Sequence, residues 1–203
     1  MEVILTMSEI DKNKMIPQYL EDLVLTIRKI IYFVGDDAQR EGLKDTPIRM
    51  IRSWQKLFEG YDRDPKELLK VFDKETYDEM VILKDVEFYS TCEHHFLPFY
   101  GKAHIAYIPK KKVIGVSKLA RLLEIYSRRL QIQERIAEQV TSFLMKELKC
   151  HGAACILEGI HFCMTSRGIQ KQNSKMITSS LKGVFKNQKP REEFINLIRK
   201  GTL

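Results

Sequence analysis

The first part of the chain has a helical pattern of apolar positions. From Ile16 to Phe33 apolar residues recur at steps of three and four, as a helix with one buried face requires. A second helix is predicted to begin at Asp45-Thr46-Pro47, where a capping residue precedes a first-turn proline, and to end at Gly60. The charged stretch from Asp62 to Tyr77 is predicted to be a connection with room for one short helix.

The period changes at Met80. The runs Val81–Phe88 and Ala103–Tyr107 are typical of strands, and turn signals at Pro98–Gly101 and Pro109–Lys112 flank the second run. We therefore expect an antiparallel pair of strands here.

Two helices and two more strands should follow. Ser117 is predicted to cap a helix that reaches Tyr126, and a second helix is predicted from about Leu130 to Leu148. The strands are expected at 153–165 and roughly 178–185. A last helix is predicted to open at Pro190 and to bury three apolar residues: Phe194, Leu197 and Ile198.

This order of elements favours an α+β fold with an antiparallel sheet, because a parallel α/β fold would alternate strand and helix more regularly. We expect an N-terminal helical region at 1–78 and a catalytic domain at 79–203. No apolar run approaches the ~20 residues of a membrane helix, and the start lacks an export signal. A cytoplasmic protein without membrane contact is predicted.

The net charge of +7 is concentrated at the C-terminal end. The stretch from Ser166 onward has nine Lys and Arg against two Glu, which equals the whole surplus. An anionic ligand near this stretch is one interpretation, and a solvated basic tail is the other. The four cysteines do not indicate a disulfide framework in a reducing compartment.

Three of the five histidines lie with two cysteines in two short clusters. They are Cys92-Glu93-His94-His95 and His161-Phe162-Cys163. Cys92 and His95 have a spacing at which a turn can direct both side chains to one ion, and His161 and Cys163 should share a face of a strand. Thiolate and imidazole are zinc ligands, and three protein ligands would leave an open, catalytic position. Composition alone does not say which histidines bind the metal.

Two further features could bind substrate. Ser117, Lys118 and Arg121 lie at a predicted helix N-terminus, where free N–H groups suit phosphate, and Arg167 adds charge after Cys163. Glu134 lies about 160° from the buried face of its helix, so it is either solvated or faces another subunit.

These motifs together resemble GTP cyclohydrolase I, the zinc enzyme that opens pterin synthesis. The resemblance covers most of the chain after residue 40. Its residues are Ser90-Thr-Cys-Glu-His-His, Gly101-Lys-Ala-His-Ile-Ala-Tyr-Ile-Pro, Val113-Ile-Gly-Val-Ser-Lys, Arg128-Arg-Leu-Gln-Ile-Gln-Glu-Arg, His161-Phe-Cys-Met, Arg167-Gly168, Arg191-Glu-Glu-Phe and Thr46-Pro47-Ile48-Arg49.

The resemblance implies a role for each site residue. Zn²⁺ would be held by Cys92, His95 and Cys163, while His94 and His161 would stay unligated as catalytic groups. Glu134, with Gln133 beside it, would anchor the guanine of GTP. The residues facing ribose and triphosphate would be Ser117, Lys118, Arg121, Arg167 and, from a neighbouring chain, Arg49.

The resemblance also implies the fold, assembly and reaction. The fold would be the tunnelling fold, an antiparallel sheet backed by two long helices, in a homodecamer with active sites between subunits. Water activated by zinc would attack C8 of the purine, His161 would protonate N7, and formate would leave before rearrangement to 7,8-dihydroneopterin triphosphate. Gly159 and Pro190 depart from the commonest family pattern without touching a predicted metal ligand.

Three alternatives remain at this stage. Tunnelling-fold relatives bind similar rings with other metal ligands or a nucleophilic cysteine, which the Cys-Glu-His-His run disfavours. A basic zinc module for nucleic acid would need exposed aromatics among its basic residues, and the basic third is poor in them, so no nucleic-acid partner is expected. A scaffold in which Cys92 and Cys163 form a disulfide is the third.

Overall fold

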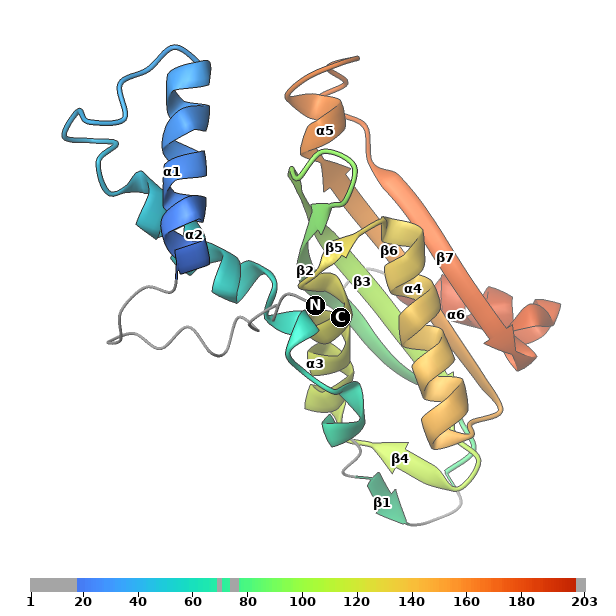
Figure 1. The fold of residues 1–203 in the computed structure, drawn as a ribbon. Coiled ribbons are helices and arrows are strands. Elements are labelled where there is room, and N and C mark those ends of the chain that lie inside the picture. Colours follow the sequence, from blue (N-terminus) through green and yellow to red (C-terminus); the bar gives the residue numbers. More distant parts are fainter. Residues whose placement is uncertain (1–17, 69–70, 74–76, 200–203) are drawn as a thin grey trace. The chain divides into compact units, whose positions relative to one another are not determined.

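The protein is described from a computed structural model, in which residues 18–68, 71–73 and 77–199 are placed (Figure 1). The chain divides into two compact units, Met1–Asp62 and Arg63–Leu203. The division predicted from the sequence, into a helical region at 1–78 and a catalytic domain at 79–203, stays a prediction.

The described part of the first unit, residues 18–62, contains two α-helices. Helix α1 spans Gln18–Phe33 and α2 spans Thr46–Leu57, with a 3₁₀ turn at Glu59–Tyr61. The proline after Thr46 stands in the first turn of α2, where its missing N–H costs no hydrogen bond. Apolar residues of both helices and of the connection between them form one cluster: Leu20, Ile27, Ile31, Ala38 and Ile51. Both predicted helices are confirmed, although residues 16 and 17 lie outside the described part.

A mixed five-stranded sheet in the order β5-β2-β3-β6-β7 organises the second unit (Figure 1). Its neighbours pair antiparallel except β5 with β2. The strands are β2 Val81–Cys92, β3 Pro98–Ile108, β5 Leu130–Gln131, β6 Gly152–His161 and β7 Met176–Gly183. The α+β class and the predicted pairing of the first two strands are confirmed.

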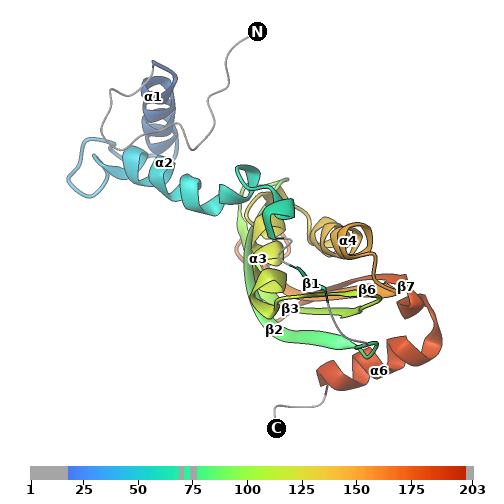
Figure 2. The same cartoon turned by 90° about the horizontal axis from the view of Figure 1, so that it is seen from below.

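Helices cover both faces of this sheet (Figure 2). On one face α3, Val116–Ser127, and α4, Gln133–Phe143, bury the main core, and α4 continues as a π turn at Leu144–Leu148. On the other face a 3₁₀ turn at Val184–Lys186 and α6, Gln188–Arg199, close a smaller cluster through two fully buried phenylalanines, Phe185 and Phe194.

A two-stranded sheet and a short 3₁₀ helix also belong to the second unit. The helix spans Pro65–Leu68, β1 spans Val71–Asp73, and β1 pairs antiparallel with β4, Lys112–Ile114. The connection predicted at 62–77 therefore holds a short helix, as expected, and also a strand. Among the described residues, no helix has the length and apolar character needed to cross a bilayer.

Several predicted boundaries are wrong for local reasons. Pro98–Gly101 is the start of β3 and not a turn, because a proline is tolerated at the first residue of a strand. Gly115 is the N-cap of α3, and Ser117 lies inside its first turn without a capping bond. Helix α6 begins at Gln188, two residues before Pro190, and leaves Leu197 45% exposed.

Candidate metal centre

A tight loop between β2 and β3 brings together the first two predicted ligands. The N–H groups of His95 and Phe96 both donate to the carbonyl of Cys92, while the Cys92 N–H donates to Leu97 O. Phe96 has a left-handed backbone, with φ of 57°, which closes the loop within five residues. As a result Cys92 Sγ lies 3.7 Å from His95 Nδ1.

The third predicted ligand comes from the end of β6, and here the local prediction is wrong. The strand ends at His161, and Phe162–Thr165 form one helical turn, α5. Cys163 therefore does not share a strand face with His161. The helical turn instead directs Cys163 to the loop after β2, so that its Sγ, Cys92 Sγ and a ring nitrogen of His95 all lie within 4.8 Å of one another.

This donor set fits zinc. Bonds of about 2.3 Å to sulfur and 2.0 Å to nitrogen at a tetrahedral angle separate the two ligand atoms by about 3.5 Å, close to the observed 3.7 Å. Cys92 is buried, Cys163 is half-buried and His95 is exposed, so the group opens to solvent on one side. Both thiols are free, which leaves them available to a metal.

The environment of Cys163 also affects its protonation. Burial raises the pKa of the Cys163 thiol, and the neighbouring Cys92 raises it further, while Arg167 acts in the opposite direction. A metal ion must therefore displace a firmly held proton to bind here.

His161 lies beside the cluster in a fixed orientation. Its ring stacks on Phe99 with centroids 4.4 Å apart and planes 7° apart, and its Nε2 lies 2.9 Å from Gln133 Oε1. Burial lowers the pKa of His161, and the charge of Glu134 raises it. His94 is exposed, with its Nε2 3.9 Å from the carboxylate of Glu93.

The first turn of α4 carries the two residues predicted to contact guanine, and they face in different directions. Glu134 is exposed, as its helical angle predicted. Gln133 is 1% exposed, and its side chain packs against β6 and β7. The backbone of Gly159 faces this amide, so the departure from the family pattern at that position does border on a predicted site residue.

The sequence did not predict an ion pair that joins α4 to the loop between β2 and β3, which carries Glu93 and His95 and is called the metal loop below. Arg135 donates two hydrogen bonds to the Glu93 carboxylate, one of them 3.0 Å from Nη2 to Oε1, and these bonds lower the pKa of Glu93. The Glu93 N–H also donates to Gln131 O, in β5. Their separation of 42 residues hid this contact, because only the pairing of β5 with β2 brings the segments together.

The predicted phosphate ligands do not all lie near this centre. Ser117, Lys118 and Arg121 are in the first turns of α3, whereas the metal loop adjoins the other end of that helix through β5. Twelve helical residues span about 18 Å. Arg167 is close enough to affect the Cys163 thiol, and Arg49 is an exposed residue of the first unit, 3.6 Å from the carboxylate of Asp45.

Comparison with known proteins identifies the family. The family profile described as GTP cyclohydrolase I matches residues 24–199. The chain belongs to the GTP cyclohydrolase I family. It is 54% identical over 176 residues to the GTP cyclohydrolase 1 of Wolinella succinogenes, covering 86% of this chain and 94% of that protein. It is 47% identical to the GTP cyclohydrolase 1 of Bacteroides fragilis, with coverages of 94% and 98%, and 48% identical to that of Campylobacter jejuni, with coverages of 88% and 93%.

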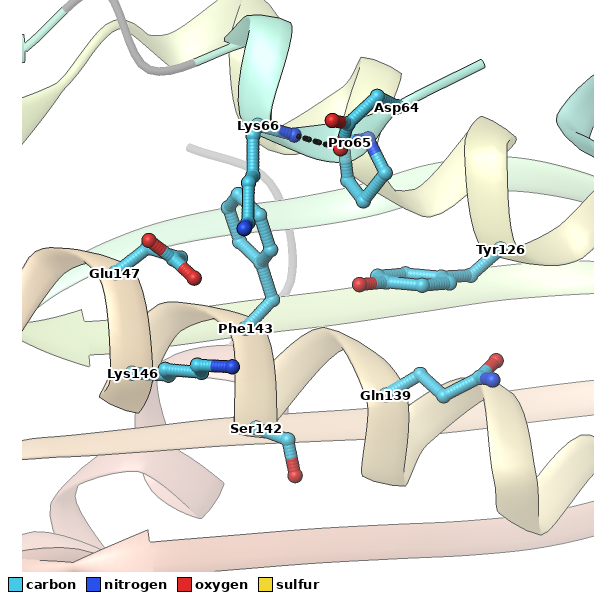
Figure 3. Close-up of a pocket in the computed structure, with 9 residues that line it drawn as sticks. All are labelled: Asp64, Pro65, Lys66, Tyr126, Gln139, Ser142, Phe143, Lys146 and Glu147. Atoms are coloured by element: carbon cyan, nitrogen blue, oxygen red, sulfur yellow. Dashed lines mark hydrogen bonds between the residues drawn. The ribbon is translucent and has the colours of Figure 1, made fainter. Parts of the chain in front are cut away.

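This GTP cyclohydrolase I family member also has a cavity in its second unit (Figure 3). Its volume is about 280 Å³, and it lies among the 3₁₀ helix at Pro65–Leu68, α3 and α4. Its walls are Asp64, Pro65, Lys66, Tyr126, Gln139, Ser142, Phe143, Lys146 and Glu147. None of the residues predicted to bind metal or GTP lines it.

Proposed function

We propose that this GTP cyclohydrolase I opens the imidazole ring of the guanine in GTP at a Zn²⁺ site made by Cys92, His95 and Cys163. The reaction releases formate and rearranges the remainder to 7,8-dihydroneopterin triphosphate, the first step of pterin synthesis. The observation that carries this proposal is the convergence of two thiols and one imidazole beside His161, in a chain of this family.

The metal supplies one property to this chemistry. Zinc, when bound, acts as a Lewis acid that lowers the pKa of a coordinated water from 15.7 to about 7. The three ligand side chains come from two segments of the chain, and the exposure of His95 leaves one side accessible to a substrate. The remaining steps require proton transfer and substrate binding by other residues.

His161 is proposed to deliver a proton to N7 as water adds at C8, and His94 is proposed to assist later proton transfers. An imidazole suits both tasks because its pKa lies near neutral pH. Burial that lowers the pKa of His161 favours release of its proton to the substrate. Hydrolysis of the resulting formamide then gives formate.

Glu134 is proposed to anchor the guanine. Its carboxylate can accept two parallel hydrogen bonds, which the N1–H and exocyclic amine of guanine can donate. Its exposure, and its electrostatic effect on His161, support a location at the open side of the metal centre. Gln133 is proposed to take part in the same site, because it lies beside Glu134 in the first turn of α4.

The triphosphate is proposed to contact Ser117, Lys118, Arg121 and Arg167, with Arg49 added from a neighbouring chain. The length of α3 between its first turn and the metal loop supports a site completed by a second copy. We accordingly propose the tunnelling fold in a homodecamer, with active sites between subunits. A cytoplasmic location is proposed as well, because a reducing compartment keeps the metal-binding thiols free.

Incubation of the zinc-loaded protein with GTP tests the proposed function. Formate and a pterin that becomes fluorescent after oxidation are expected in equal amounts. Zinc-loaded protein that consumes GTP without forming either product would contradict it.

A further inference from the structure

Gln133 has a side chain whose environment differs from that of a substrate contact. It is 1% exposed, whereas its neighbour Glu134 faces solvent. A buried amide needs partners for its oxygen and for its N–H₂ group. Those partners show what the side chain does.

The N–H₂ end of this amide can be identified from its neighbours. Gln133 Nε2 lies 3.1 Å from Leu157 O, 3.0 Å from Met176 O and 3.0 Å from Thr178 Oγ1. Carbonyl oxygens only accept hydrogen bonds, so the atom facing two of them must be the donor nitrogen. The opposite orientation would place four oxygens together, of which only the Thr178 hydroxyl could donate a hydrogen bond. The amide oxygen therefore faces His161.

This orientation determines the protonation of the imidazole. Gln133 Oε1 lies 2.9 Å from His161 Nε2, and an amide oxygen can only accept, so Nε2 must carry a hydrogen. A neutral imidazole has one N–H, which leaves Nδ1 of His161 as the bare nitrogen. Stacking on Phe99 restrains rotation of the ring out of this arrangement.

Gly159 makes room for the arrangement. A Cβ at this position would lie 2.2 Å from Gln133 Oε1 and 3.2 Å from its Cδ, which is too close for either atom to stay in place. The Gln133 amide thus packs against the backbone of Gly159, beside the ring of His161.

We propose that Gln133 is a positioning residue, which holds His161 Nε2 so that Nδ1 is the nitrogen that exchanges protons with the substrate. The inference rests on the proposed role of His161 in ring opening. It assigns the Gln133 amide to the histidine and not to the guanine.

The tautomer can be measured without any reaction. Zinc-loaded protein with ¹⁵N-labelled histidine is studied by solid-state NMR at mildly alkaline pH, where imidazole is neutral, and a His161→Asn variant assigns the signals. The expected result is a protonated Nε2 and a bare Nδ1 at His161. A protonated Nδ1 with a bare Nε2 overturns the inference.

Kinetics test the consequence for turnover. Gln133→Met keeps the volume and removes both polar ends, and should lower kcat about 10- to 100-fold, as loss of a supporting partner typically does, with unchanged zinc content and KM for GTP. Gln188→Met, at an exposed position of α6, is the control and should behave as the parent. A raised KM with normal kcat indicates a guanine contact and overturns the inference, as does unchanged kcat.

A second variant covers the case in which Gln133→Met does not fold. Gly159→Ala keeps the glutamine but displaces its oxygen, so kcat should fall in the same way, with the tautomer signal of His161 altered. Normal kcat in this variant, with the signal unaltered, counts against the inference. If the parent protein forms no formate from GTP, the proposed function fails instead, and the tautomer measurement still decides the position of the proton.

Discussion

The metal centre and the first turn of α3 differ in how complete they are within one chain. Three ligand atoms, a stacked histidine and the buried amide of Gln133 already surround the metal centre. At the other end of α3, Ser117 and Arg121 are exposed.

Under the proposed function, the difference separates what one chain supplies from what a second copy completes. The metal-ligand atoms and the ring of His161 must be placed within tenths of an ångström, and they come from one end of the sheet and the loops attached to it. The residues proposed to hold the highly charged triphosphate lie on an exposed helix end, which is accessible to the proposed second copy. Changes at the metal centre should therefore affect turnover and metal content, and changes on α3 should affect GTP binding.

The largest effect is expected from removing a metal ligand. Cys163→Ala should lower both zinc content and formate release at least about 100-fold, because two remaining ligands hold the ion poorly. Metal analysis and a formate assay measure this. Cys150→Ala removes a buried thiol outside the cluster and serves as the control. Full activity in a metal-free Cys163→Ala protein would show that the cluster is not the reaction centre.

Glu134→Gln should have the next largest effect. A charge-assisted hydrogen bond contributes about 1.5–3 kcal/mol, so KM for GTP should rise about 10- to 100-fold, while zinc content stays the same. Glu138→Gln, one turn further along α4, changes a carboxylate paired with Lys182 and is the control. Unchanged GTP affinity would remove Glu134 from the guanine site.

Arg121→Ala tests the α3 end. KM for GTP should rise about tenfold, the effect of one charged hydrogen bond, and the defect should disappear when guanosine replaces GTP. Lys189→Ala removes the same charge from α6 and should change little. An equal defect with guanosine would mean that Arg121 acts on the fold or on the purine.

The smallest effect is the pH dependence of metal binding. Since burial and Cys92 raise the pKa of Cys163, this thiol is protonated at neutral pH, and zinc must displace the proton. Zinc affinity should therefore increase with pH, by about tenfold per unit for each proton displaced, until the thiol ionises without metal. Competition with a chelator across pH measures the slope. A slope of zero would mean that the thiols do not bind the ion.

Local patterns predicted the elements well and their ends less well. The β2–β3 pair and both backing helices follow from periodicity, which reports the buried face directly. The Pro98 error arose because a proline suits both a turn and a strand start. The α5 turn at Cys163 was missed because four residues are too few to show a helical period.

Candidate site residues were predictable where chemistry is concentrated in the sequence. The Cys–His runs indicated the metal cluster, and helical geometry indicated that Glu134 is exposed. The Arg135–Glu93 pair and the packing of Gln133 over Gly159 depend on strand pairing between distant segments. No local pattern reports such contacts.

Co-expression of two inactive variants tests most directly whether two copies complete one site. Each active site is proposed to have a metal half, the metal centre of one copy, and a phosphate half, the triphosphate-binding residues on α3 of another copy. Cys163→Ala lacks the metal half, and a Lys118→Glu/Arg121→Glu variant lacks the phosphate half. If each site takes one half from each of two copies, random assembly of equal amounts gives about one quarter of sites with both halves intact. Formate release should then return to about one quarter of the parent rate. No recovery in oligomers shown to contain both variants would contradict a shared site.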